Sequence, residues 1–130
     1  MNTVQIIAFT HRQFNFDEIG LFHLDDKQRI DVLTNLKTNL DIDELMYLST
    51  CNRVEFIVSH EKKITKTFVE KLIKQLLADQ LPVNLKDIVH RAEIINSKAA
   101  VQHIFSVASS IDSLVVGERE IITQVRKAFE

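Results

Sequence analysis

The spacing of apolar side chains divides the chain into short segments that alternate between strand and helix periodicity. Residues 3–9 and 45–58 are rich in β-branched and aromatic residues, which predicts a strand and then a hairpin. Between them, apolar residues from Ile30 to Leu40 recur at helical spacing, and Asp25 or Asp26 is a suitable N-cap. The first half of the chain therefore reads as strand, helix and two paired strands.

The second half repeats this alternation. Residues 63–79 have a one-sided apolar pattern that predicts a second helix, and residues 88–95, IVHRAEII, predict a fourth strand. A third helix is expected after residue 96, and a further helix from Ile121 is still periodic where the sequence stops. The predicted class is α+β, a ferredoxin-like β-α-β-β-α-β sandwich followed by helices.

Composition narrows the function classes. The 130 residues are 45% hydrophobic and 26% charged with a net charge of −2, which fits one globular domain without a general attraction for nucleic acids. A single cysteine excludes an internal disulfide and a zinc site built from several thiolates. Gly20 and Gly117 are the only glycines, so neither the dinucleotide fingerprint nor the P-loop can be written. Without a signal peptide or a long apolar run, a cytoplasmic location is expected.

The most reactive group in the sequence lies at the tip of the predicted hairpin. Thr50, Cys51, Asn52 and Arg53 place a hydroxyl, a thiol, an amide and a guanidinium in four consecutive positions. An adjacent cation favours the thiolate, which attacks carbonyls, and a guanidinium also binds carboxylates. The alternative is a small buried cysteine at a strand end, which is the more common setting for a lone cysteine.

Two other polar positions stand out without indicating a function by themselves. The segment from Ser113 to Gln124 gathers acidic and amide side chains, which is typical of a solvated helix start. His103 lies between apolar residues of the third predicted helix, where a histidine usually packs or faces solvent.

Two sequence segments together resemble a known family. "LSTCNRVE" (48–55) and "SLVVGEREIITQVRKAF" (113–129) resemble the signatures of glutamyl-tRNA reductase. "HIFSVASSIDS" (103–113) extends this resemblance, and "IIAFTHR" (6–12) is similar to the opening strand of the family. These enzymes begin tetrapyrrole (porphyrin) synthesis by converting glutamyl-tRNA to glutamate-1-semialdehyde with NADPH.

The resemblance implies a domain organisation and a set of partners. Residues 1–112 would be the catalytic ferredoxin-like domain, and residues 113–130 a substrate-contacting turn with the start of a long spinal helix. The NADPH-binding and dimerisation domains of the family would be absent, so this chain would bind no cofactor and no metal. The implied partners are glutamyl-tRNA, a second copy of the full-length enzyme and glutamate-1-semialdehyde aminomutase, with no membrane contact.

The resemblance also implies residue roles. Cys51 would attack the ester of glutamyl-tRNA and form an enzyme thioester, and His103 would donate or accept a proton. The implied substrate-binding residues are Thr50, Asn52, Arg53, Ser113, Glu118, Arg119, Glu120 and Gln124. By itself, the chain is expected to form the thioester and hydrolyse it, without making the aldehyde.

Some positions depart from the family pattern. Arg119 and Glu120 stand where the family usually has proline and glutamine, which puts their individual contacts in doubt, and Val54 replaces a common threonine. A second hypothesis is a non-catalytic ferredoxin-like module that binds a ligand or a partner and holds Cys51 buried and unreactive. The exposure of the thiol separates these two hypotheses.

Overall fold

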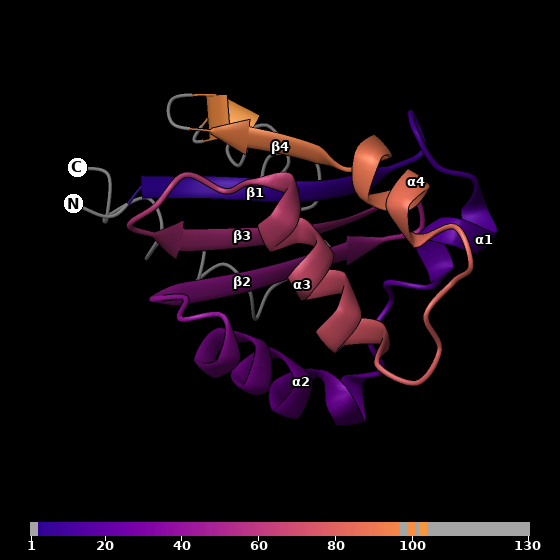
Figure 1. The fold of residues 1–130 in the computed structure, drawn as a ribbon, viewed down its shortest axis with the longest axis horizontal. Coiled ribbons are helices and arrows are strands. Elements are labelled where there is room, and N and C mark those ends of the chain that lie inside the picture. The colour runs from indigo at the N-terminus through magenta and orange to yellow at the C-terminus, as the bar shows by residue number, and fades with distance from the viewer. Residues whose placement is uncertain (1–2, 97–98, 101, 104–130) are drawn as a thin grey trace.

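One four-stranded antiparallel sheet organises the protein, whose computed structural model describes residues 3–96, 99–100 and 102–103. The strands are β1 (Thr3–Thr10), β2 (Glu44–Thr50), β3 (Arg53–His60) and β4 (Glu93–Asn96). Their order in the sheet is β2-β3-β1-β4, so the chain returns to place the first strand between the third and the fourth (Figure 1). Every neighbouring pair is antiparallel, and the β2–β3 hairpin pairs Thr50 with Arg53 at its tip.

Four helices connect the strands. They are α1 (Phe16–Gly20) and α2 (Asp26–Asn39) between β1 and β2, and α3 (Lys66–Leu77) and α4 (Leu85–Arg91) between β3 and β4. Asn15, Asp25 and Thr65 cap the first three helices, each through a side-chain oxygen that accepts a backbone N–H of the first turn. Figure 1 shows α3 crossing in front of the sheet, α2 beside β2, and α1 and α4 near the end where the β2–β3 hairpin turns.

The sheet has two unlike faces. The face toward the helices carries the main core, which includes Phe9, Phe56 and Leu72 and is dominated by aromatic and aliphatic side chains. The opposite face, here called the second face, carries a smaller buried cluster. Its members are Val4, Ile6, Ala8, Met46, Leu48, Ile57 and Ala100. Because side chains alternate along a strand, Arg53, Glu55 and Ile57 of β3 share this second face.

The sequence-based prediction of a strand over residues 88–95 is wrong in its first half. Residues up to Arg91 belong to α4, and only Glu93–Asn96 form a strand. Ile88 and Val89 are buried in the main core, so the apolar side chains of this segment are buried by the packing of a helix rather than by strand pairing. The ammonium of Lys66 ends the helix by donating to the carbonyls of Val89, His90 and Ala92.

The other predicted elements compare as follows. The strand at 3–9, the hairpin within 45–58 and the helix within 63–79 are confirmed with shifts of a few residues, as is the helix capped by Asp25. The short helix α1 was not predicted, because it holds a single buried apolar residue, Ile19, and depends on the capping box of Asn15. A mixed fold of helices and an antiparallel sheet is thus confirmed. In the part of the chain that the structure describes, the helices are too short or too polar to cross a bilayer.

Candidate functional site

Cys51 lies in the two-residue turn between β2 and β3, and it is exposed. Because the thiol is exposed, a large molecule can approach the sulfur without displacing core residues. A buried cysteine, which the hypothesis of a non-catalytic module requires, is therefore contradicted. The exposure agrees with a thiol that meets a bulky substrate.

Hydrogen bonds from backbone N–H groups hold the turn in place. The Asn52 N–H donates to the Thr50 hydroxyl over 3.3 Å, which closes the turn around Cys51. The His11 N–H, just beyond β1, donates to the Asn52 carbonyl over 3.0 Å. Thr50 and Asn52 thus have observed roles in shaping the turn, whatever they contact in a substrate.

A second clasp fixes the strand that leads into the turn. The Tyr47 hydroxyl donates to the Phe22 carbonyl over 2.8 Å and accepts the Leu24 N–H over 3.0 Å. Next to it, the Ser49 hydroxyl and His23 Nδ1 are 2.5 Å apart. The loop between α1 and α2 is therefore attached to the end of β2, two residues before the thiol, which limits the movement of the turn.

The charged centre of the site consists of Arg53, Glu55 and His103, and it lies at the start of β3, just after the turn. Arg53 Nη1 is 3.4 Å from Glu55 Oε1, and His103 Nε2 is 2.5 Å from the same oxygen. Glu55 is fully buried, whereas Arg53 and His103 are partly exposed. The structure thus brings two of the predicted site residues, Arg53 and His103, together through a carboxylate.

Glu55 had no role in the sequence-based prediction, although the letter E ends the segment LSTCNRVE. It stands between Val54 and Phe56, both of which are fully buried in the main core. A glutamate in the middle of an apolar strand is rarely buried without a partner, so the alternation of this strand was a usable signal. What the sequence could not supply was the partner, since His103 is 48 residues away.

The other predicted substrate-binding residues lie outside the described residues. They are Ser113, Glu118, Arg119, Glu120 and Gln124. Their roles remain predictions. No group of three or more histidine, cysteine, aspartate or glutamate side chains within the described ranges is placed to hold a metal ion.

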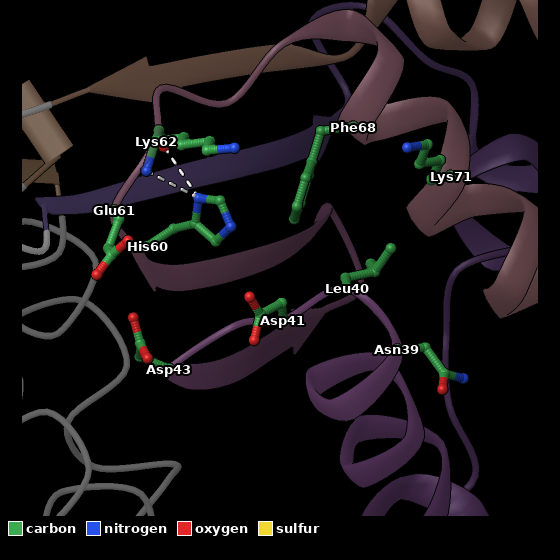
Figure 2. A pocket seen from close by; sticks show the side chains of 9 residues that line it. All are labelled: Asn39, Leu40, Asp41, Asp43, His60, Glu61, Lys62, Phe68 and Lys71. Carbon is green, nitrogen blue, oxygen red and sulfur yellow. Dashed lines mark hydrogen bonds between the residues drawn. The ribbon is translucent and has the colours of Figure 1, made fainter.

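A hollow of about 500 Å³ lies at the far end of the same hairpin. Figure 2 shows its lining, with charged side chains of both signs around an open centre. The lining residues are Asn39, Leu40, Asp41, Asp43, His60, Glu61, Lys62, Phe68 and Lys71. β2 has seven residues, which span roughly 20 Å, so this hollow and Cys51 are too far apart to form one site.

Comparisons with known proteins point to one enzyme family. The model of the glutamyl-tRNA(Glu) reductase N-terminal domain family matches residues 7–130. A glutamyl-tRNA reductase of a Nitratiruptor species is 37% identical over 128 residues, and one of Sulfurimonas denitrificans is 36% identical over 124 residues. These alignments cover 96% and 95% of the chain but 28% of each relative, so the chain spans just over a quarter of their length.

A solved structure shows the same likeness in three dimensions. The glutamyl-tRNA reductase from Methanopyrus kandleri superposes with a TM-score of 0.56 at 25% sequence identity. The match covers 99% of this chain and 28% of that one. Together with the family model and the relatives, this places the chain in the glutamyl-tRNA reductase family, as its N-terminal domain.

Proposed function

We propose that this domain carries out the acyl-transfer half of the glutamyl-tRNA reductase reaction, with Cys51 as the nucleophile. The observation that carries the proposal is the exposed thiol at the tip of a braced hairpin, two residues before a guanidinium, in a chain that belongs to this family. An oxidoreductase of this kind needs an acyl group that accepts hydride, and a thioester is more electrophilic than a free carboxylate.

The proposed step is an exchange of an oxygen ester for a thioester. The Cys51 sulfur attacks the ester carbonyl of glutamyl-tRNA, the bond between that carbon and the ribose oxygen breaks, and a carbon–sulfur bond forms. The proton of the thiol passes to the departing ribose oxygen. His103 is the proposed proton carrier, and Arg53 is the proposed partner of the side-chain carboxylate of the substrate.

The remaining family roles are part of the same proposal. Thr50 and Asn52 would line the glutamyl pocket from the turn. Glu118 and its neighbours Ser113, Arg119, Glu120 and Gln124 would contact the substrate from the segment that begins the spinal helix. In this organisation residues 1–112 form a ferredoxin-like catalytic domain. The sheet order β2-β3-β1-β4, with helices between β1 and β2 and between β3 and β4, supports that type.

Reduction of the thioester by NADPH is assigned to a part of the enzyme beyond these 130 residues. The residues here do not fit a dinucleotide, because two distant glycines cannot form the phosphate-binding turn. Homodimerisation, contact with glutamate-1-semialdehyde aminomutase and a cytoplasmic location complete the proposal by analogy with the family.

The test is to trap the acyl-enzyme. The protein is mixed with glutamyl-tRNA that carries a radiolabelled glutamyl group, quenched in acid and separated under denaturing conditions. We expect label on the wild-type chain that hydroxylamine removes, no label on Cys51→Ser, and slow release of free glutamate instead of aldehyde when the chain acts alone. Equal labelling of Cys51→Ser would contradict the proposal.

A relocated thiol provides the matched control. Val83 is fully exposed, so Val83→Cys in the Cys51→Ser background supplies one accessible thiol away from the hairpin. We expect this double variant to react with small alkylating reagents but not with glutamyl-tRNA. Labelling of the relocated thiol would mean that any accessible cysteine reacts with glutamyl-tRNA. The residues around Cys51 would then contribute nothing to the reaction.

A further inference from the structure

We propose that Glu55 is the positioning residue of this site, holding the His103 imidazole and the Arg53 guanidinium in their working orientations. The inference rests on the proposed function, because it assigns a role within the same acyl transfer. It adds a residue to which the family resemblance gave no role, on the basis of geometry that only the folded chain shows.

The geometry concerns one carboxylate oxygen. Glu55 Oε1 lies 2.5 Å from His103 Nε2 and 3.4 Å from Arg53 Nη1. A carboxylate accepts but does not donate, so Nε2 must carry the proton in this contact. The proton on Nε2 leaves Nδ1 of the neutral ring as the acceptor, and the orientation of the ring is fixed with it.

The burial of Glu55 indicates that this contact serves more than stability. Glu55 is fully buried, and its second oxygen, Oε2, has no hydrogen-bond partner among the described residues. Burying a carboxylate with an unsatisfied oxygen opposes folding, because the group loses hydration that its neighbours do not replace. Replacing a buried charge together with its partners by apolar residues is often neutral or stabilising, so stability alone gives little reason for a carboxylate at this position.

The chemistry needs such a residue. As the thiol proton moves to the leaving ribose oxygen, His103 passes through the imidazolium form. A buried negative charge against Nε2–H stabilises that form, and the fixed tautomer makes Nδ1 the nitrogen that takes up and releases the proton. The same oxygen limits the swing of Arg53, whose guanidinium then presents its remaining N–H groups to a substrate carboxylate.

The test compares Glu55→Gln with a matched control, Glu93→Gln. Glu93 lies on the same face and in the same row of the sheet, since both glutamates pair with Ala8 of β1. The first readout is proton NMR of the protein alone. A carboxylate-bound imidazole N–H resonates at unusually low field, and His103→Gln identifies the signal. We expect Glu55→Gln to abolish this signal and Glu93→Gln to leave it unchanged.

The second readout is the single-turnover rate of thioester formation at saturating glutamyl-tRNA. We expect Glu55→Gln to lower this rate at least tenfold, toward the roughly hundredfold that general acid–base groups contribute. Glu93→Gln should stay close to wild type. Should Glu55→Gln fail to fold, Glu55→Leu removes the same charge without burying a new polar group and is measured in the same two ways.

Several results would overturn the inference. They are a loss of rate under tenfold, a low-field signal that survives in the Glu55 variant, and an equal loss of rate in Glu93→Gln. The outcome is distinguishable from failure of the proposed function. If the wild-type protein forms no thioester, the proposed function fails, while the NMR signal still reports whether Glu55 holds His103.

Discussion

Two glutamates of this domain, Glu18 and Glu55, each bind an arginine but differ in how completely they are satisfied. Glu18 Oε1 accepts the Asn15 N–H and Arg91 Nη1, each over 3.0 Å, and Oε2 contacts Arg91 Nη2 at 2.5 Å. Glu55 uses one oxygen for both Arg53 and His103, and its other oxygen is buried without a partner among the described residues. Glu18 lies near the surface, whereas Glu55 is fully buried.

The difference separates a structural ion pair from a functional one. Around Glu18 the hydrogen bonds are numerous and cooperative, since Arg91 also donates to the Gln13 carbonyl and lies over the Phe14 ring. That arrangement joins α1 to α4. Around Glu55 one oxygen of a desolvated carboxylate has no partner within the described part of the chain, which is typical of a site that stabilises charge during a reaction.

The largest effect on stability is expected from Arg91→Met, which tests the structural half of this comparison. Methionine keeps much of the packing on Phe14 but removes every charged hydrogen bond to Glu18. We expect a loss of about 2–3 kcal/mol in the free energy of unfolding, measured by denaturant titration, with unchanged labelling of Cys51 by glutamyl-tRNA.

Asp87 offers the matched control for that variant. It also contacts Arg91, at 2.8 Å, but its side chain is 58% exposed. Asp87→Ala should therefore cost less than about 1 kcal/mol. If Arg91→Met and Asp87→Ala had equal effects, Glu18 would not be the partner that matters.

A smaller effect concerns the acid sensitivity of the protein. Hydrogen bonds from the Arg91 side chain and from the Asn15 N–H lower the pKa of Glu18 from 4.5 to about 2. Because the folded pKa is the lower one, this contribution is complete above pH 4.5 and is lost as the pH falls toward 2. Glu18→Gln should be less stable at neutral pH and should lose less stability on acidification. The measurement is the free energy of unfolding of the wild type and of Glu18→Gln at several pH values. An equal change with pH in the two proteins would contradict the prediction.

The smallest effect on stability is expected from Glu55→Leu, which tests the functional half. Leucine removes the buried charge and the unsatisfied oxygen, while Arg53 and His103 are exposed enough to bind water instead. We expect the free energy of unfolding to change by less than about 1 kcal/mol, with either sign, measured in the same denaturant titration. A loss of more than about 3 kcal/mol would show that Glu55 is structural, and the contrast with Glu18 would disappear.

The parts of the fold that the sequence predicted are those in which local and long-range packing agree. The strand at Thr3–Thr10 is apolar on both faces because it lies in the middle of the sheet, and it is buried along nearly its whole length. The helix at Asp26–Asn39 has both a capping aspartate and helical spacing. The β2–β3 turn also followed from the sequence, since small and polar residues interrupt two apolar runs, whereas the exposure of its thiol came from the structure.

The parts that the sequence did not predict depend on distant partners. Residues 88–91 have strand-like composition, but Lys66 binds the carbonyls at the end of this helix and the main core buries its apolar side. The charge of Glu55 is stabilised by nearby Arg53 and by His103, which is far along the chain but comes to lie against it. In both cases a single sequence shows the residue types. It does not show the long-range contact that makes residues 88–91 helical or allows Glu55 to be buried.

The pleat of β3 sets a rule for how this hairpin can vary through evolution. Arg53 and Glu55 face the same way only because they are two positions apart on one strand. Insertion or deletion of a single residue just after Arg53 would rotate the carboxylate into the layer of aromatic rings and bring a hydrocarbon side chain beside the histidine. Homologous chains should consequently tolerate amino-acid substitutions between Cys51 and Glu55. The number of residues between these two positions should stay constant.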